Sequence, residues 1–154
     1  MAHKVAIVMG SKSDAGVMQA AADILHEFGI DSEIHVISAH RMPKRATEFA
    51  ESAVGAGFSA IIAGAGGAAH LAGVMAAFTP LPVIGVPVKS PALNGLDSLL
   101  SIVQMPSGVP VATVAIDGAK NAGILAAQII GVSDPDIRRK IVEYKEKLAE
   151  QVGK

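Results

Sequence analysis

Five short apolar segments, each followed by residues at the spacing of an amphipathic helix, constrain this fold more than any other feature of the sequence. The first segment, residues 5–9, is apolar at every position and does not alternate with polar residues. Such a segment is typical of a strand that helices cover on both faces of a parallel sheet. The other four strands are expected at residues 34–37, 60–63, 83–86 and 111–116.

The segments between these strands predict helices. The first follows Ser13, a residue type that favours the N-cap position, and the others are expected at about residues 43–54, 71–78, 96–103 and 121–130. Strands that alternate with helices form βαβ units, so the sequence predicts a three-layer α/β/α sandwich with a parallel, doubly wound sheet of about five strands. A last helix follows Asp134 and Pro135, and it is expected either to seal a sheet face or to dock on a neighbouring subunit.

Length and charge narrow the class of protein. The 154 residues fit a single α/β domain over residues 1–154, with no linker or repeat. Thirteen Lys and Arg against fourteen Asp and Glu leave a net charge of −1, so neither a nucleic acid nor a membrane surface is an expected partner. Cysteine is absent, which excludes disulfides and thiolate chemistry and favours a cytoplasmic location.

The apolar content points to self-association. Hydrophobic residues make up 51% of the chain, and the mean hydropathy is +0.45. A small domain with this composition has more nonpolar surface than its own core hides, and symmetric association covers such surface. We therefore expect a homo-oligomer.

Polar and small residues gather where the first three strands end. Residues 11–14, 38–41 and 64–70 follow these strands, and the carboxyl ends of parallel strands form one rim where ligands bind. They supply hydroxyls and a guanidinium for phosphate, a carboxylate for sugar hydroxyls, a loop of small residues and two imidazoles. This set fits a ribose phosphate that carries a reactive head group.

Three other site classes fit less well. Residues 64–69 match the dinucleotide pattern G-x-G-x-x-A, but they follow the third strand, and no acidic residue ends the next one. A phospho-receiver domain would need an aspartate at the end of the third strand, where Gly-Ala-Gly stands. Two histidines and one aspartate are too few for a metal hydrolase, so no metal is expected.

Five blocks of the sequence, in order, resemble a known family. They are GSKSD at 10–14, SAHR at 38–41, AGAGGAAHL at 63–71, GVPV at 85–88 and LNGLDSLLSIVQMPSGVPVATVAI at 93–116. Together they resemble the class I N5-carboxyaminoimidazole ribonucleotide mutases of bacterial purine biosynthesis, the PurE family, from about Val5 to Ile130. Three positions depart from the usual pattern, namely Met42, Ala72 and a short segment at 116–121.

The resemblance implies a flavodoxin-like fold, a homo-octamer, and a reaction that moves a carboxylate from N5 to C4 of the ribonucleotide without cofactor or metal. It implies that His40 is the acid and base, that His70 lines the carboxylate pocket, and that Asp14 holds the ribose. The phosphate would be held by Ser11, Ser13, Ser38 and Arg41, and the rest of the substrate would contact Ala39, Gly66, Gly67 and Leu71.

Two alternatives to the mutase stay open at this point. Class II enzymes of similar fold carboxylate aminoimidazole ribonucleotide directly with carbon dioxide, and the chemistry of the residues alone does not separate the two classes. A non-catalytic nucleotide sensor would keep the phosphate-binding residues and would tolerate the loss of His40.

Overall fold

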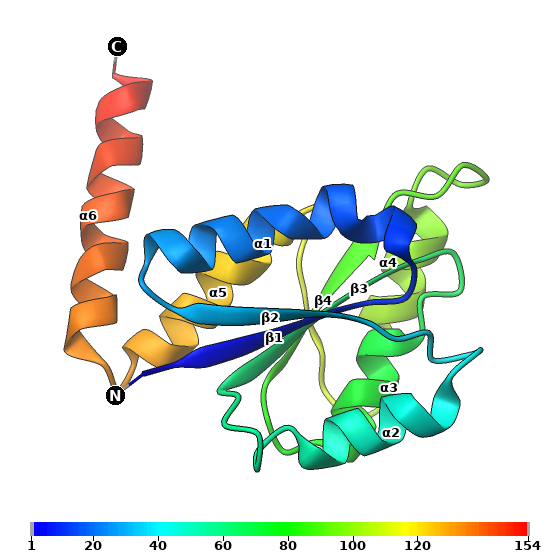
Figure 1. The fold of residues 1–154 in the computed structure, drawn as a ribbon. Helices are drawn as coiled ribbons and strands as arrows, with labels where there is room; N and C mark the ends of the chain where they lie inside the picture. The colour runs from blue at the N-terminus through cyan, green and yellow to red at the C-terminus, as the bar shows by residue number, and fades with distance from the viewer. Residues whose placement is uncertain (1, 154) are drawn as a thin grey trace.

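The computed structural model describes residues 2–153 and contains a five-stranded parallel sheet between two layers of helices (Figure 1). The strand order is β2-β1-β3-β4-β5, and each neighbouring pair is parallel. This is the flavodoxin-like order, and it confirms the expected fold class. The strands are β1 (Lys4–Met9), β2 (Asp31–Val36), β3 (Ala60–Gly66), β4 (Val83–Val88) and β5 (Ala112–Thr113).

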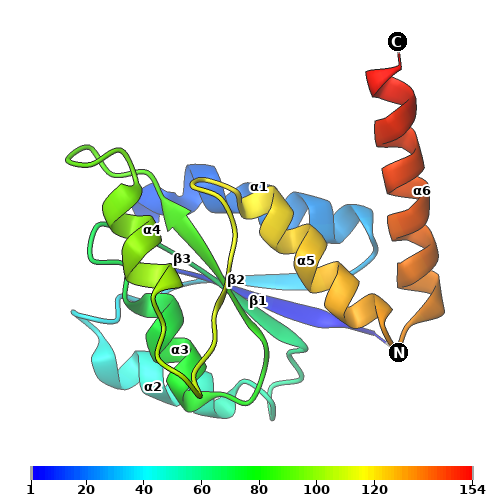
Figure 2. The ribbon, with the colours of Figure 1, turned by 180° about the vertical axis from the view of Figure 1, so that it is seen from behind.

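The helices cover both faces of the sheet. On one face lie α1 (Ala15–Glu27) and α5 (Ala119–Gly131), and on the other lie α2 (Pro43–Ser52), α3 (Leu71–Phe78) and α4 (Leu96–Val103) (Figure 2). Helices α3 and α4 have the bounds that the sequence predicts. Two separate hydrophobic cores result, one on each side of the sheet.

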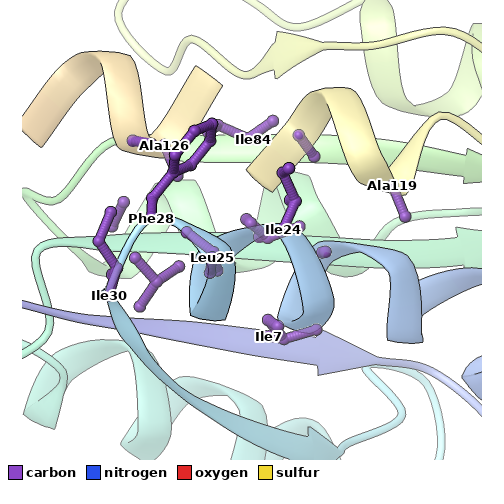
Figure 3. Close-up of a cluster of buried hydrophobic side chains, with 14 of the residues drawn as sticks. Ile7, Ile24, Leu25, Phe28, Ile30, Ile84, Ala119 and Ala126 are labelled. Atoms are coloured by element: carbon purple, nitrogen blue, oxygen red, sulfur yellow. The ribbon is translucent and has the colours of Figure 1, made fainter. Parts of the chain in front are cut away.

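Strand β1 shows why its sequence does not alternate. Ile7 packs into the core beneath α1 and α5, together with Ile24 and Phe28 (Figure 3), while Ala6 and Val8 pack into the opposite core. All three strand residues are fully buried. Because both faces of the strand meet helices, every position must be apolar.

Three expectations about strands are wrong. Strand β2 covers Asp31–Val36 rather than residues 34–37. The fifth strand has two residues instead of six, although the Val114 N–H still donates to the Gly85 carbonyl (3.1 Å). Pro87, expected after the fourth strand, lies inside β4. Its carbonyl accepts from the Asp117 N–H (2.8 Å), so its missing N–H faces the side where β5 has already ended, and no ladder bond is lost there.

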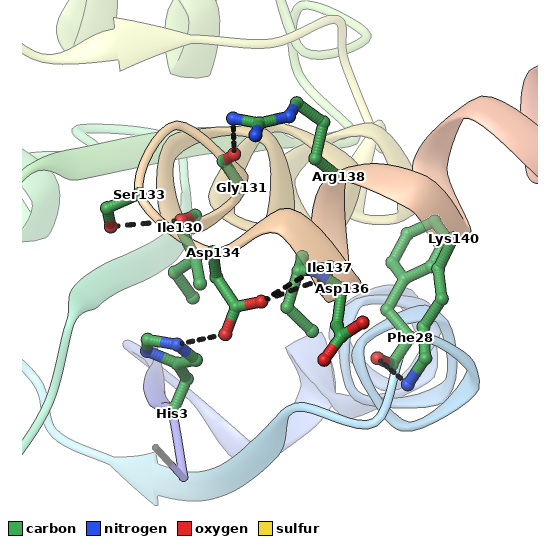
Figure 4. A network of polar contacts seen from close by, with 10 residues as sticks. All are labelled: His3, Phe28, Ile130, Gly131, Ser133, Asp134, Asp136, Ile137, Arg138 and Lys140. Atoms are coloured by element: carbon green, nitrogen blue, oxygen red, sulfur yellow. Dashed lines mark hydrogen bonds and ion pairs between the residues drawn. The ribbon is translucent and has the colours of Figure 1, made fainter.

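The last helix, α6 (Pro135–Val152), packs on α5 rather than on a face of the sheet, and its far end extends away from the body (Figure 1). Asp134 caps it by accepting from the N–H of Ile137 (3.1 Å), and its other carboxylate oxygen lies 2.9 Å from Nε2 of His3 (Figure 4). Lys140 donates to the Phe28 carbonyl (2.8 Å) and so ties α6 to the end of α1. Among residues 2–153, no helix is both long and apolar enough to cross a membrane.

Candidate functional site

A cavity of about 490 Å³ opens at the carboxyl ends of the first four strands. Its position agrees with the rule that ligands bind where the strand order reverses, here between β1 and β3. All eleven residues that the sequence analysis assigns to the site line this one cavity, namely Ser11, Ser13, Asp14, Ser38, Ala39, His40, Arg41, Gly66, Gly67, His70 and Leu71.

The first wall is a one-turn helix, η1 (Lys12–Asp14), between β1 and α1. The sequence predicted Ser13 as the N-cap, but the structure has Ser11 in this position. The Ser11 hydroxyl accepts from the Ser13 N–H (3.3 Å) and from the Ser13 hydroxyl (2.9 Å). Ser11 takes this role because it is the extended residue before the turn. Two hydroxyls thus lie at the positive end of α1, where an anion is stabilised.

Asp14 is the buried carboxylate of this wall, with 7% of its surface exposed. Burial raises the pKa of its carboxyl, and a hydrogen bond from the Ser11 backbone N–H opposes the rise. A carboxylate that faces a cavity with little hydration is a ready acceptor for hydroxyl groups of a ligand.

The second wall carries Arg41 after β2. The Ser38 hydroxyl accepts from the backbone N–H of Arg41 (3.2 Å) and from its Nε (3.3 Å). Among residues 2–153, the two terminal guanidinium nitrogens of Arg41 form no hydrogen bond or ion pair. The hydrogen bond to Ser38 therefore orients the guanidinium through Nε and leaves its two terminal nitrogens available to bind an anion.

The third wall places two histidines in contact. Strand β3 runs to Gly66, further than expected, Gly67 then turns with a φ of 66°, and His70 stands at the N-cap of α3. His40 Nε2 lies 2.7 Å from His70 Nδ1, with the rings perpendicular. In this hydrogen bond one of the two nitrogens donates its proton and the other accepts, and the tautomers of the two rings decide which is which.

The fourth wall, which was not expected from the sequence, comes from the end of β4 and the loop after it. Val88, Lys89, Ser90, Pro91, Ala92 and Asp97 line the cavity there. The Ser90 hydroxyl donates to the Asp97 carboxylate (2.5 Å), and this bond is the main reason that the pKa of Asp97 is lowered. The only sign of this wall in the sequence was the long loop after the fourth strand, and a loop sequence does not indicate which part of the fold it covers.

The site has no cluster that would hold a metal ion. Within the described residues 2–153, no group of three or more His, Cys, Asp or Glu side chains is arranged so that it could hold a metal ion. The polar groups that converge on the cavity are hydroxyls, the Arg41 guanidinium, the Lys89 ammonium, the carboxylates of Asp14 and Asp97, and two imidazoles. These groups can bind a phosphorylated sugar and can move a proton.

Comparisons with known proteins agree with this chemistry. The AIR carboxylase family profile matches residues 4–151. The N5-carboxyaminoimidazole ribonucleotide mutase of Thermotoga maritima is 64% identical over 97% of this chain and 87% of its own. The mutase of Pyrococcus horikoshii is 62% identical over 96% of this chain and 84% of its own. The crystal structure of Treponema denticola PurE superposes with a TM-score of 0.88 at 31% identity, over 97% of this chain and 93% of that one.

Proposed function

Because this chain belongs to the AIR carboxylase family, we propose that it isomerises N5-carboxyaminoimidazole ribonucleotide to 4-carboxy-5-aminoimidazole ribonucleotide, a step of purine biosynthesis. The observation that carries the proposal is the contact between His40 and His70, 2.7 Å apart in a cavity whose other side is built for an anion. This isomerisation requires the protein to bind the substrate's phosphate and to transfer a proton.

The phosphate would bind at the positive end of α1. Ser11 and Ser13 present hydroxyls there, and Arg41, held by Ser38, faces the same cavity from the second wall. Asp14 lies beside the two serines and would accept hydrogen bonds from the ribose hydroxyls. This arrangement directs the imidazole ring of the substrate toward the histidines and the small residues of the third wall.

His40 would move the proton in both halves of the reaction. The bond from N5 to the carboxylate breaks as the imidazolium delivers a proton to N5, and carbon dioxide is released within the cavity. Carbon dioxide then forms a bond to C4, and the neutral imidazole takes the proton that C4 gives up. The protein regains its starting protonation state, and no cofactor is consumed. An imidazole suits both steps because it can act as a general acid in one step and as a general base in the next.

The small residues at the end of β3 leave room for carbon dioxide. Gly66 and Gly67 line the cavity without side chains, so the third wall is formed by backbone at this point. A tight pocket that excludes water keeps the released carbon dioxide beside C4. We place the migrating carboxylate here, next to Gly66, Gly67, His70 and Leu71.

The direct test supplies purified protein with N5-carboxyaminoimidazole ribonucleotide, without ATP or added metal, and follows the C4-carboxylated isomer. Conversion is the expected result. A protein that is inert on this substrate but carboxylates aminoimidazole ribonucleotide with carbon dioxide would be a class II enzyme. Binding of both ribonucleotides without turnover would identify a sensor.

Removal of the Arg41 guanidinium is expected to weaken substrate binding. Arg41→Ala should raise KM by about 10- to 100-fold, since a charge-assisted contact to phosphate contributes roughly 1.5–3 kcal/mol. Inorganic phosphate should inhibit the unmodified protein competitively and should inhibit this variant far less. Arg45→Ala is the matched control, because Arg45 is exposed on α2 and does not line the cavity. Equal KM values for the two variants would place the phosphate elsewhere.

Asp14→Asn is expected to stabilise the protein while it weakens the ribose contact. Because burial raises the native pKa of Asp14, its proton stabilises the native state below the ordinary carboxyl pKa, and that stability is lost as pH rises through the raised pKa. The variant should therefore have the higher free energy of unfolding at pH 7, with the difference shrinking at acid pH. Urea unfolding across this range tests the sign, and KM should rise about tenfold. A less stable variant at neutral pH would contradict the burial argument.

The homo-octamer implied by the resemblance belongs to the same proposal, as does a cytoplasmic location. Exposed apolar side chains support self-association, including Val132 at 79% and Val142 at 51% exposure, which lie beside the junction of α5 and α6. Light scattering should give eight times the chain mass of 15.6 kDa. A monomer in dilute solution would contradict it.

A further inference from the structure

Gly67, which turns the chain from β3 toward His70, is held by two serines of α4. The Ser98 hydroxyl accepts from the Gly67 N–H (2.9 Å) and donates to the Val88 carbonyl (2.6 Å). The Ser101 hydroxyl lies 3.3 Å from the Gly67 carbonyl oxygen and 2.7 Å from the Asp97 carbonyl oxygen. The two serines contact both peptide groups of Gly67, and we call them the serine clamp.

Ser98 is the stronger half of the serine clamp. Its side chain is fully buried and does not line the cavity. Its single proton goes to Val88, so its lone pairs are directed to the Gly67 N–H, and the hydroxyl joins the ends of β3 and β4. A buried hydroxyl that is satisfied on both sides holds its partners in one geometry.

By holding Gly67, Ser98 also sets the orientation of the peptide group between Gly67 and Ala68. The N–H groups of Ala69 and His70 donate to the carbonyls of Gly67 and Ala68, and the Gly67 N–H is taken by Ser98. Among residues 2–153, the Ala68 N–H has no acceptor, and Ala68 lines the cavity. Of the four amides in the turn, this one alone is left for a ligand.

We propose that Ser98 is a positioning residue: it fixes the left-handed turn at Gly67 so that the Ala68 N–H is presented to the migrating carboxylate. The inference rests on the proposed mutase function and adds a residue to it. In the cycle, carbon dioxide leaves N5 and must bind C4 before it diffuses away. An amide held against it keeps its oxygens in place, because an oriented donor needs no reorganisation during the reaction.

The test measures two products of one substrate. With N5-carboxyaminoimidazole ribonucleotide, the C4-carboxylated isomer reports the complete cycle, and free aminoimidazole ribonucleotide reports carbon dioxide that escaped. Ser98→Ala should lower kcat by about 10- to 100-fold and raise the escaped fraction several-fold. KM should change by less than about threefold, since the phosphate and ribose contacts lie on other walls. Loss of folded protein alone would lower the rate but would leave the product ratio and KM unchanged.

The controls separate the possible failures. Ser107→Ala removes an exposed serine in the loop after α4 and should match the unmodified protein in both products. If Ser98→Ala does not fold, Ser98→Cys is used, because a thiol fills the site but makes weak hydrogen bonds. If the folded Ser98 variant gives the same ratio of isomer to free aminoimidazole ribonucleotide as the unmodified protein, the positioning role of Ser98 is wrong, but the proposed mutase function is unaffected. If the unmodified protein forms no isomer, the proposed function itself fails.

Discussion

Replacing His40 with asparagine is expected to lower kcat for the isomerisation by about a thousandfold or more. General acid–base catalysis contributes roughly 10²–10⁴-fold, and here one imidazole serves two proton transfers. KM should stay within a few-fold, because the proposed phosphate and ribose contacts come from other residues. His40 is exposed to the cavity, so the substitution leaves both hydrophobic cores unchanged. Steady-state kinetics with the purified variant check this expectation.

Two further histidine variants make the result specific. His26→Asn changes an exposed imidazole in the last turn of α1, away from the cavity, and should keep full activity. His70→Asn removes the partner of the 2.7 Å contact and should reduce kcat less than the loss of His40. The assignment of roles would reverse if His70→Asn abolished isomerisation and His40→Asn retained it.

Gly123→Ala is expected to cost about 2 kcal/mol of unfolding free energy. Gly123 lies on α5 where this helix crosses α1, and an added Cβ would overlap the Ile24 side chain and come within 3.0 Å of the Ala21 carbonyl oxygen. The Ala21 backbone belongs to a helix and cannot move alone, so the two helices must separate and loosen the core shown in Figure 3. Overpacking of this kind costs roughly 1–3 kcal/mol and outweighs the gain in helix propensity.

Gly16→Ala is the matched comparison. Gly16 also lies in a helix, the first turn of α1, but an added Cβ there meets no atom within 4 Å. Only the helix propensity changes, so this variant should be neutral or more stable by up to about 1 kcal/mol. The urea midpoint of Gly123→Ala should fall, whereas that of Gly16→Ala should stay unchanged or rise. Equal midpoints would show that α1 and α5 adapt at no cost.

The candidate site was largely visible in the sequence because its residues follow strands. Ser11, Ser38 and the residues after Ala63 each come after an apolar segment, and parallel strands must end on the same rim. The fold class alone was therefore enough to predict that these residues line one cavity. The wall from Val88 to Asp97 was missed because a loop carries no periodicity, and its place over the cavity depends on which strand neighbours β3.

The sequence by itself determined the order of strands and helices, the bounds of α3 and α4, the rim and the family, because apolar periodicity and contiguous motifs are local properties of the chain. The tertiary structure alone decided that Pro87 continues β4, that His40 contacts His70 and that Ser98 holds Gly67. Each of these depends on a partner from another segment, as Gly67 depends on Ser98, 31 positions further along the chain, and no local pattern specifies that partner.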